Sequence, residues 1–444
     1  MDSARDDRAA WLGLLTAVGL VALAMVVPAL TGWEVRARSA AAGGISVPPL
    51  HGTWQPYGVG PGTVPAVLLA LAGWRWATGL ADRLPWRRLL LVSYAVALAW
   101  ALSLATTDGW AGIAHVTAHG YDYGDTARSV TDVGTLLEGW VPRIGADHPD
   151  NFVTHVAGHP PLALLFFVAL VRVGLGDDLA MGIAVTVVAA TTAPSVMVAL
   201  RRLGAEDAAR RAAPFLVLAP AAIFMAVSGD AVFAAVGAAG LAALATAATS
   251  AGPRMVGWSV VAGLLLGSAV MMSYGLPLLG LLALAVLRLA RRWWPLPVSA
   301  AAALALVLAF AASGFAWWEG YAELTDRYWR GLASQRPGAY WTWANLAALV
   351  LAAGPVLGAG VGRLAALRRR ADPVVGLLVA AAAACVLTAT ASQMSRAEVE
   401  RIWLPFLPWL MVSTALLPDR WRRPALGLQV GWAIALETLL YTSW

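Results

Sequence analysis

Stretches of about 20 apolar residues recur along the whole chain, and this repetition limits the possible folds more than any other feature. The first stretch, Trp11 to Leu30, contains no charged residue. A helix of about 20 apolar residues is long enough to cross the hydrocarbon core of a bilayer. The 444 residues are 60% hydrophobic and only 13% charged, and no soluble-looking block separates the apolar stretches. The sequence therefore predicts an all-α, polytopic transmembrane protein and excludes an ordinary soluble enzyme.

We expect about 13 spans and one shorter apolar segment, Leu162 to Val171, directly after Pro160 and Pro161. The first span has no convincing cleavage site, so we expect it to stay in the protein. The expected spans lie at residues 11–30, 62–78, 89–107, 179–200, 212–228, 231–249, 256–272, 275–290, 297–315, 343–362, 374–391, 402–417 and 425–441.

Arginine predicts the orientation of these spans. All 31 basic residues are arginine, the net charge is +6, and the arginines cluster in short loops, around residues 83–88, 201–211, 288–292, 363–370 and 420–423. Cytoplasmic loops carry the excess of positive charge. The five clusters share one side only if Leu162 to Val171 does not cross fully, so we expect a re-entrant or oblique segment there. The N-terminus is then cytoplasmic, the protein lies in the plasma membrane, and a nucleic-acid partner is not expected.

The opposite, extracytoplasmic face collects all six histidines and most carboxylates, so we expect any chemistry there. Its polar residues concentrate at 108–159, 228–230, 317–340 and 396–401. Ionisable residues beside spans are costly unless they face a cavity or pair with one another. We divide the chain accordingly into a membrane segment 1–107, an outer catalytic loop 108–161, central helices 162–315, an outer aromatic and charged loop 316–342 and C-terminal helices 343–444.

The first long outer loop, Asp108 to His159, is too long to be an ordinary connection. Apolar residues at helical spacing from Val133 to Val141 predict a short amphipathic helix lying on the membrane surface. His155 and His159 are four residues apart, as in some metal sites, but Gly158 and the following proline interrupt a helix there. We therefore favour hydrogen-bonding or substrate-contact roles for both histidines. We expect no cofactor, and a divalent metal is an alternative that we do not favour.

Several other residues have simple structural explanations. Most of the 22 tryptophans are expected to anchor the chain at the membrane interface. Cys385 is the only cysteine and lies in an apolar run, so no intramolecular disulfide is possible. Glu437 is the one carboxylate that we place inside a span, and the sequence does not identify its partner.

An outer cavity lined by carboxylates, arginines and aromatic residues suits glycosyl transfer from a lipid-phosphate donor. A carboxylate would deprotonate the acceptor hydroxyl, and cations would stabilise the phosphate leaving group. Transport is the alternative, but it would place polar groups at mid-depth and is often associated with an internal repeat. The halves show no convincing repeat, which favours an interfacial enzyme over a transporter or flippase.

Short motifs add a family resemblance. Tyr121-Asp122-Tyr123 is followed by Thr154 to Pro161, which reads THVAGHPP, and Glu398 to Phe406 reads EVERIWLPF. Together with Trp-Trp-Glu-Gly at 317–320 and Arg327-Tyr328, this pattern resembles polyprenyl-phosphate-sugar-dependent glycosyltransferases of the GT-C fold. That group includes protein mannosyltransferase and aminoarabinose transferase families. The resemblance covers most of the chain from about residue 89. The pattern of motifs is similar to that of uncharacterised actinobacterial members.

This resemblance implies an acidic base in the first outer loop, where Asp122 is the best match and Asp125 the second. Here the loop follows the third span, so two additional N-terminal spans are needed to match the family. The remaining expected site residues contact the donor, hold the arginines that bind its phosphate, or position the acceptor. They are His155, His159, Asp230, Arg327, Arg336, Glu398, Glu400 and Arg401. The implied partners are a polyprenyl-phosphate sugar donor, a glycan, lipid or protein acceptor, and membrane lipids. A non-catalytic GT-C-like envelope assembly protein remains an alternative.

Overall fold

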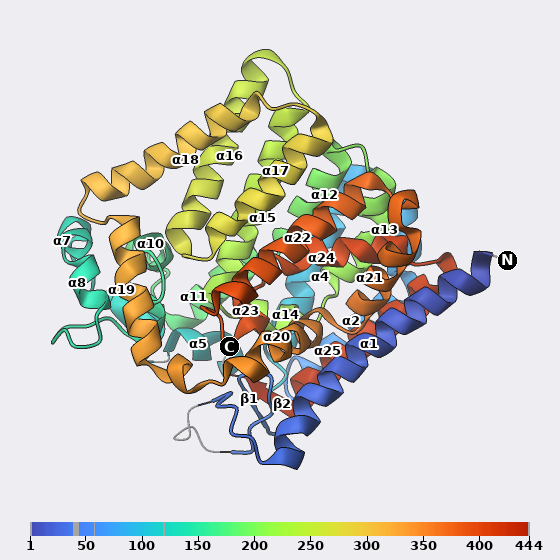
Figure 1. Cartoon of the computed structure of the whole chain (residues 1–444), viewed down its shortest axis with the longest axis horizontal. Helices are drawn as coiled ribbons and strands as arrows, with labels where there is room; N and C mark the ends of the chain where they lie inside the picture. The colour runs from blue at the N-terminus through green and yellow to red at the C-terminus, as the bar shows by residue number, and fades with distance from the viewer. Residues whose placement is uncertain (1, 39–43, 57, 119, 443–444) are drawn as a thin grey trace.

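The computed structural model describes residues 2–38, 44–56, 58–118 and 120–442. Within these ranges the chain is almost entirely helical (Figure 1). The one sheet in the described part of the chain has two short antiparallel strands, β1 (Gly52–Trp54) and β2 (Leu440–Thr442). It brings the loop after the first helix to the end of the last helix. The prediction of an all-α, polytopic membrane protein is confirmed.

Eight helical segments of the described chain are long and apolar enough to cross a membrane. They lie in α1 (Asp2–Thr31); in α2 (Thr63–Ala72), η2 (Gly73–Ala77) and α3 (Thr78–Arg83), which run on as one segment; in α4 (Trp86–Leu104); in α11 (Asp178–Ala189) with α12 (Thr192–Arg202); in α15 (Gly229–Ala248); in α16 (Gly252–Met272); in α18 (Pro295–Ala312); and in α22 (Pro373–Ser392). A ninth would be the pair α20 (Gly338–Ala353) and α21 (Val356–Leu367), which bends by 108°.

The number of long helices is therefore smaller than the 13 spans expected, because proline divides several of the apolar runs. The run at 212–228 breaks at Pro220, between α13 (Glu206–Val217) and α14 (Ala222–Met225), whereas Pro214 lies inside α13. The run at 402–417 contains Pro405 and Pro408 and forms only short helices: α23 (Val399–Ile402), α24 (Leu407–Met411) and η6 (Val412–Leu416). Proline interrupts a helix because it lacks a backbone N–H and clashes with the preceding turn.

Two more of the expected segments differ in length or polarity from a standard span. The run at 275–290 forms η3 (Leu276–Leu278) and α17 (Leu279–Ala290), a short apolar unit, and α25 (Asp419–Leu439) is long but begins with charged residues. The segment after Pro160 forms α10 (Pro161–Arg172), which has 12 residues and is too short to cross a bilayer. Its short length agrees with the expected re-entrant or oblique segment.

Helix α15 lies at the centre of the bundle, and nearly all of its residues are buried. Helices α11, α12, α16 and α17 pack around it, whereas α18 contacts mainly α16 and is mostly exposed. Helix α1 lies against α21 at a close crossing, where a Cβ added to Gly13 would stand 2.0 Å from the carbonyl oxygen of Gly358. Only glycine permits this approach.

The first outer loop is a chain of short helices rather than an irregular coil. They are α5 (Ala111–Ala118), α6 (Tyr123–Ser129), α7 (Val133–Glu138), α8 (Trp140–Ile144) and α9 (Thr154–Ala157). The single amphipathic helix expected at 133–141 is instead α7 and α8, which meet at Gly139. Trp140 and Ile144 are fully buried, and α8 packs against α19 (Trp317–Arg330). The apolar side of this segment thus covers protein.

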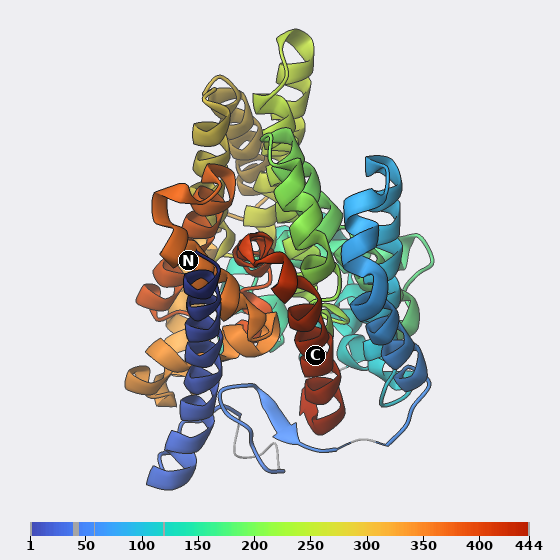
Figure 2. The same cartoon turned by 90° about the vertical axis from the view of Figure 1, so that its right-hand side faces the viewer.

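Ion pairs join several arginine clusters at one end of the molecule. Arg422 binds Asp82 at 2.8 Å, Arg211 binds Asp419 at 2.6 Å, and Arg420 binds Asp7. These contacts connect α3, α13, α25 and α1, and we call this the arginine end. The strands β1 and β2 lie at the opposite end, at the bottom of Figure 2. The loop after α1 folds back beneath the bundle there and reaches the polar residues described next.

Candidate functional site

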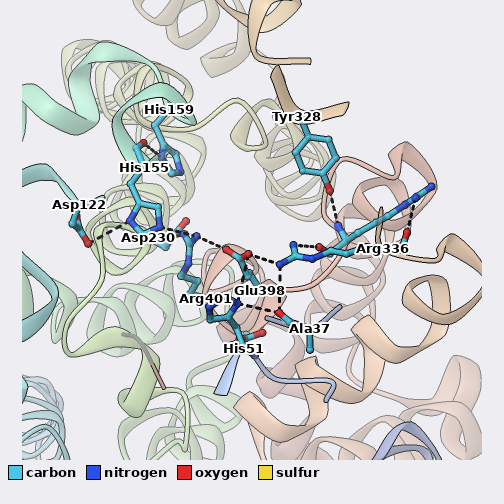
Figure 3. Close-up of polar contacts among 12 residues, drawn as sticks. Ala37, His51, Asp122, His155, His159, Asp230, Tyr328, Arg336, Glu398 and Arg401 are labelled. Carbon is cyan, nitrogen blue, oxygen red and sulfur yellow. Dashed lines mark hydrogen bonds and ion pairs between the residues drawn. The ribbon is translucent and has the colours of Figure 1, made fainter. Parts of the chain in front are cut away.

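Asp122 begins the cluster of buried polar residues shown in Figure 3. It is the N-cap of α6, and its Oδ1 accepts a hydrogen bond from the backbone N–H of Tyr123 at 2.6 Å. Aspartate is favoured at this position because its carboxylate satisfies a free N–H of the first turn. Only 4% of the residue is exposed. The cap thus fixes one oxygen, and Oδ2 points toward His155.

His155 connects Asp122 to the arginines. It lies in the single turn of α9, and its backbone N–H donates to the carbonyl of Tyr121 at 3.1 Å. Its Nδ1 lies 3.4 Å from Asp122 Oδ2, and its Nε2 lies 3.4 Å from Arg401 Nη2. A guanidinium can only donate, so Nε2 carries the lone pair and Nδ1 carries the proton that faces the carboxylate. His155 is therefore held in one tautomer.

Arg401 is the centre of the cluster. Its Nη1 donates to Asp230 Oδ2 at 2.6 Å, and its Nη2 donates to Glu398 Oε2 at 3.0 Å. Asp230 stands in the first turn of α15, whereas Arg401 and Glu398 belong to the short turn around α23. Burial by itself would lower the pKa of Arg401, but the carboxylates of Asp230 and Glu398 outweigh it and raise that pKa. The guanidinium thus keeps its charge although it is buried.

Glu398 bridges two arginines. Its Oε1 accepts from Arg336 Nη2 at 2.9 Å while Oε2 faces Arg401. Burial would raise the pKa of Glu398, but Arg336, His51 and Arg401 together lower it well below the usual range. Ala397 and Glu398 have φ angles of 71° and 63°. This left-handed conformation costs about 1–2 kcal/mol for a residue other than glycine, so strained backbone presents the Glu398 carboxylate to both cations.

Arg336 also binds two backbone carbonyls. Its Nε donates to the carbonyl of Arg36, in the loop after α1, at 3.1 Å, and its Nη1 donates to the carbonyl of Arg396 at 2.5 Å. Arg336 is only 5% exposed. The arginine therefore joins three segments that are far apart in sequence: the loop after α1, the loop before α20 and the turn before α23.

Glu400 and His51 form a second buried contact beside the cluster. The backbone N–H of His51 donates to Glu400 Oε1 at 2.9 Å, while Glu400 Oε2 has no hydrogen-bond partner among the described residues. Burial raises the pKa of Glu400 to about 7. Burial also lowers the pKa of His51 to about 4, and its Nδ1 donates to the carbonyl of Ala37 at 3.1 Å. Both side chains are therefore neutral near pH 5–6.

His159 lies next to His155 but is held by different partners. Its Nδ1 is 2.8 Å from the carbonyl oxygen of His155 and 2.8 Å from the hydroxyl of Tyr123. Because a carbonyl can only accept, Nδ1 carries the proton and Nε2 keeps its lone pair. Burial lowers the pKa of His159, so the ring is neutral at physiological pH. Tyr123 stacks on Phe167 of α10 at 4.8 Å, and this contact fixes the position of the tyrosine.

The structure thus brings together eight of the ten residues expected from the sequence: Asp122, His155, His159, Asp230, Arg336, Glu398, Glu400 and Arg401. The other two lie outside this cluster. Asp125 is largely exposed and pairs with Arg128 at 2.7 Å. Arg327 donates to the carbonyls of Ile144 and Phe152 at 2.7 and 3.0 Å. These contacts fasten α8 and the following loop to α19.

Sequence analysis did not assign His51, Ala37 or Tyr328 to the site. The hydroxyl of Tyr328 accepts a hydrogen bond from the backbone N–H of Arg396 at 2.9 Å, which steadies the turn that leads to Glu398. The one available signal for His51 was its place among the histidines expected on the outer face. The carbonyl of Ala37 gave no signal, because any residue supplies a backbone carbonyl.

An apolar cavity of ≈ 540 Å³, including its open mouth, adjoins the segments that carry the cluster. Its walls include Ala222 and Met225, which precede Asp230, and Leu407 and Met411, which follow Arg401. Within the described ranges, no group of three His, Cys, Asp or Glu side chains is arranged to hold a metal ion. The cluster therefore offers a fixed carboxylate, two histidines and two arginines, and the apolar cavity is lined by residues that precede Asp230 and follow Arg401 in the chain. Searches of protein-family models, curated proteins and solved structures found no match to this chain.

Proposed function

We propose that the protein transfers a sugar from a polyprenyl-phosphate donor to a hydroxyl group of a cell-envelope acceptor. Asp122 is the general base in this proposal. The observation that carries it is the buried Asp122 carboxylate, which a helix cap and the His155 ring hold in one orientation within the Arg401 cluster. A general base must be positioned within hydrogen-bond reach of the proton that it removes. Fixing both carboxylate oxygens provides such positioning.

The reaction is a substitution at the anomeric carbon. The acceptor oxygen forms a bond to this carbon and gives its proton to Asp122, while the bond from the anomeric carbon to the phosphate oxygen breaks. The polyprenyl phosphate leaves with the electron pair of that bond. Arg401 and Arg336 stabilise the charge that develops on the phosphate, since preorganised cations act most strongly where water is excluded. The Nδ1 proton of His159 is held by the His155 carbonyl, so the Nε2 lone pair accepts a hydrogen bond from a hydroxyl group of the sugar or the acceptor.

Glu398 has a specific part in this scheme. Its carboxylate occupies the space between Arg336 and Arg401, at 2.9 and 3.0 Å from them. A donor phosphate that binds both arginines competes with this carboxylate. Asp230 remains on Arg401 at 2.6 Å and keeps the guanidinium in place during the exchange. The cavity lined by Ala222 and Leu407 receives the apolar tail of the donor.

The proposed sidedness follows from the separation of the two polar regions. The arginine end joins clusters that favour the cytoplasmic side of a membrane, whereas the cluster around Arg401 is made by loops that alternate with them along the chain. We therefore propose a plasma-membrane protein with a cytoplasmic N-terminus and an extracytoplasmic site. The acceptor is a glycan, lipid or protein on that side.

Transport is the second candidate function, and the bent pair α20 and α21 favours it. Transporters bind substrates where helices are discontinuous, and this pair bends by 108° at Gly354 and Pro355. Gly354, however, packs against Pro220 and Gln429 rather than against the ionisable cluster. An enzyme explains the buried carboxylate–histidine contact better than a transporter does.

The test compares Asp122→Asn with Asp125→Asn. Both variants remove one carboxylate near the start of α6, but Asp125 is largely exposed and lies outside the cluster. The substrates are farnesyl phosphates that carry glucose, mannose or arabinose, incubated with membranes containing the protein, and the measurement is the release of farnesyl phosphate. We expect the Asp122 variant to lose about 100- to 10,000-fold in rate and the Asp125 variant to keep its rate. Equal rates in wild type and Asp122→Asn would remove Asp122 as the base. If no donor reacts, uptake of the same compounds into vesicles tests transport.

A further inference from the structure

A second apolar cleft lies between the segment α2–η2–α3 and the helices α4 and α13. The cleft and its open mouth together enclose ≈ 640 Å³ of empty space. Ser93 is the only lining residue with a hydroxyl group. The walls include Trp76, Ala77, Leu84, Leu89, Val92 and Leu218.

One wall of this cleft is a π-helical turn. Residues Gly73–Ala77 form η2, which interrupts the otherwise α-helical segment from Thr63 to Arg83. Such turns are rare and occur frequently at functional sites, because the extra residue turns neighbouring side chains to new directions. Trp76 and Ala77 of this turn line the cleft. A Cβ on Gly73 would stand only 2.3 Å from Leu218 Cδ1, so glycine allows the π turn to approach the opposite wall.

Three arginines at one end of the cleft have no carboxylate partner among the described residues. Arg83 precedes the lining residue Leu84, while Arg87 and Arg88 precede the lining residue Leu89. All three are exposed, and in the described chain no carboxylate pairs with them. The neighbouring arginines differ in this respect: Arg422 binds Asp82, and Arg210 binds Glu206. The positive charge at this end of the cleft is therefore available to a ligand.

We infer that this cleft binds an anionic glycerophospholipid. An acyl chain enters the apolar cleft, and the phosphate group contacts Arg83, Arg87 and Arg88. Basic pockets between membrane helices bind anionic head groups in this way. The helices that flank the cleft carry exposed leucines, among them Leu68 and Leu91, so the mouth opens toward lipid rather than toward water. Charge complementarity then selects an anionic lipid over a zwitterionic one.

This lipid site is separate from the proposed glycosyl transfer. It lies near the arginine end, and none of its lining residues belongs to the cluster around Arg401. A role for the three arginines in membrane orientation alone would explain their charge. It would not explain why an apolar cleft and a π turn lie beside them.

The experiment measures thermal unfolding of the full-length protein, purified and delipidated in a neutral detergent. Phosphatidylglycerol and phosphatidylcholine with identical acyl chains are added separately. A ligand that binds only the folded state raises the unfolding temperature in proportion to its affinity. We expect phosphatidylglycerol to raise the Tm at lower concentration than phosphatidylcholine does. In the triple variant Arg83→Gln, Arg87→Gln and Arg88→Gln, we expect the affinity for phosphatidylglycerol to fall by about fivefold per arginine removed.

The matched control is Arg368→Gln, Arg369→Gln and Arg370→Gln, which removes the same charge from another exposed cluster that lines neither cavity. This variant should keep the full response to phosphatidylglycerol. Val92→Trp, at a partly exposed wall position, should fill the cleft and remove the response while the lipid-free Tm shows that the fold persists. Equal Tm shifts with both lipids, equal losses in both triple variants, or an unchanged response in Val92→Trp would each overturn the inference.

Discussion

The two polar regions of the molecule use the same residue types in opposite ways. At the arginine end the carboxylates of the ion pairs reach the surface: 83% of the Asp419 side chain and 44% of the Asp82 side chain are accessible. In the candidate site the side chains of Arg401 and Asp230 are only 8% and 5% accessible, and each cation has more than one partner. The carboxylates of the arginine end are thus accessible to water, whereas Asp230 and Arg401 are buried in one connected network.

This difference bears on what each region does. Exposed ion pairs contribute about 0–1 kcal/mol because water and salt screen them. Burying a charged network costs several kcal/mol per ion in lost hydration, and well-packed apolar residues often stabilise a fold equally well. Stability alone therefore does not account for Arg401 and its partners. The expense of burying this network favours a functional site there, and the arginine end needs no such explanation.

The largest expected effect comes from breaking the buried network at Asp230. Asp230→Asn leaves Arg401 with one carboxylate instead of two, and removing one partner of a buried pair destabilises a protein by about 3–5 kcal/mol. Chemical denaturation in detergent measures this change. Adding Arg401→Met should restore most of the stability without restoring sugar transfer. If the double variant were as unstable as the single one, the cost would arise from packing rather than from charge.

The next largest effect concerns pH and the contact between His51 and Glu400. The pKa of Glu400 is raised to about 7, so its contribution to stability is complete below about pH 4.5 and is lost as the pH rises through 7. The pKa of His51 is lowered to about 4, so its contribution is complete above about pH 6.5 and is lost as the pH falls through 4. Between about pH 4.5 and 6.5 the two dependences oppose each other and nearly cancel.

Single variants should therefore reveal opposite slopes. Of this pair only His51 titrates in Glu400→Gln, so stability should rise relative to wild type between pH 5 and 6.5 by up to about 1.4 kcal/mol per pH unit. Of this pair only Glu400 titrates in His51→Asn, so stability should fall relative to wild type by a similar amount over the same range. Unfolding curves at pH 5.0, 5.75 and 6.5 measure both slopes. Parallel profiles for the two variants would mean that these residues do not titrate as described.

The sequence was sufficient to predict much of the network. Asp122, Asp230 and Arg401 are ionisable residues placed next to apolar helices, where a charge is costly unless it has a partner. That reasoning identified the residues but not their connections. Whether Arg401 binds Asp230, Glu398 or Asp122 depends on how α15, α23 and α6 pack, which one sequence does not reveal.

Two other kinds of feature could not be predicted. One depends on where a loop folds back onto the bundle, and the other on whether proline interrupts an apolar helix. His51 reaches Glu400 only because the loop after α1 folds beneath the bundle and pairs with β2. The described chain has fewer long apolar helices than the 13 spans expected, because hydrophobicity was counted without the effect of Pro220, Pro405 and Pro408. In contrast, the short segment after Pro160 was correctly expected, since its apolar run ends within 12 residues.

Arg327 should have a smaller effect that is purely structural. It donates to two backbone carbonyls, at Ile144 and Phe152, and lies outside the cluster. Arg327→Ala should destabilise the protein by about 1.5–3 kcal/mol, because hydrogen bonds from charged donors contribute about that much. The KM for a farnesyl-phosphate sugar should not change. A raised KM with unchanged stability would instead place Arg327 at the substrate.

The smallest expected effect is at the arginine end, and it is the reference against which the effect of breaking the buried network is compared. Asp419→Asn removes the partner of Arg211, but the Arg211 guanidinium also donates to the carbonyls of Ala415 and Leu417 at 2.7 and 2.5 Å. The loss of the exposed carboxylate should therefore change the free energy of unfolding by less than about 1 kcal/mol, and raising the salt concentration should reduce the difference further. The same salt titration on Asp230→Asn should leave its larger cost nearly unchanged, because a buried pair is poorly screened. Equal salt sensitivity in the two variants would show that water reaches Arg401 as readily as it reaches Arg211, and the contrast between the two regions would then be one of position only.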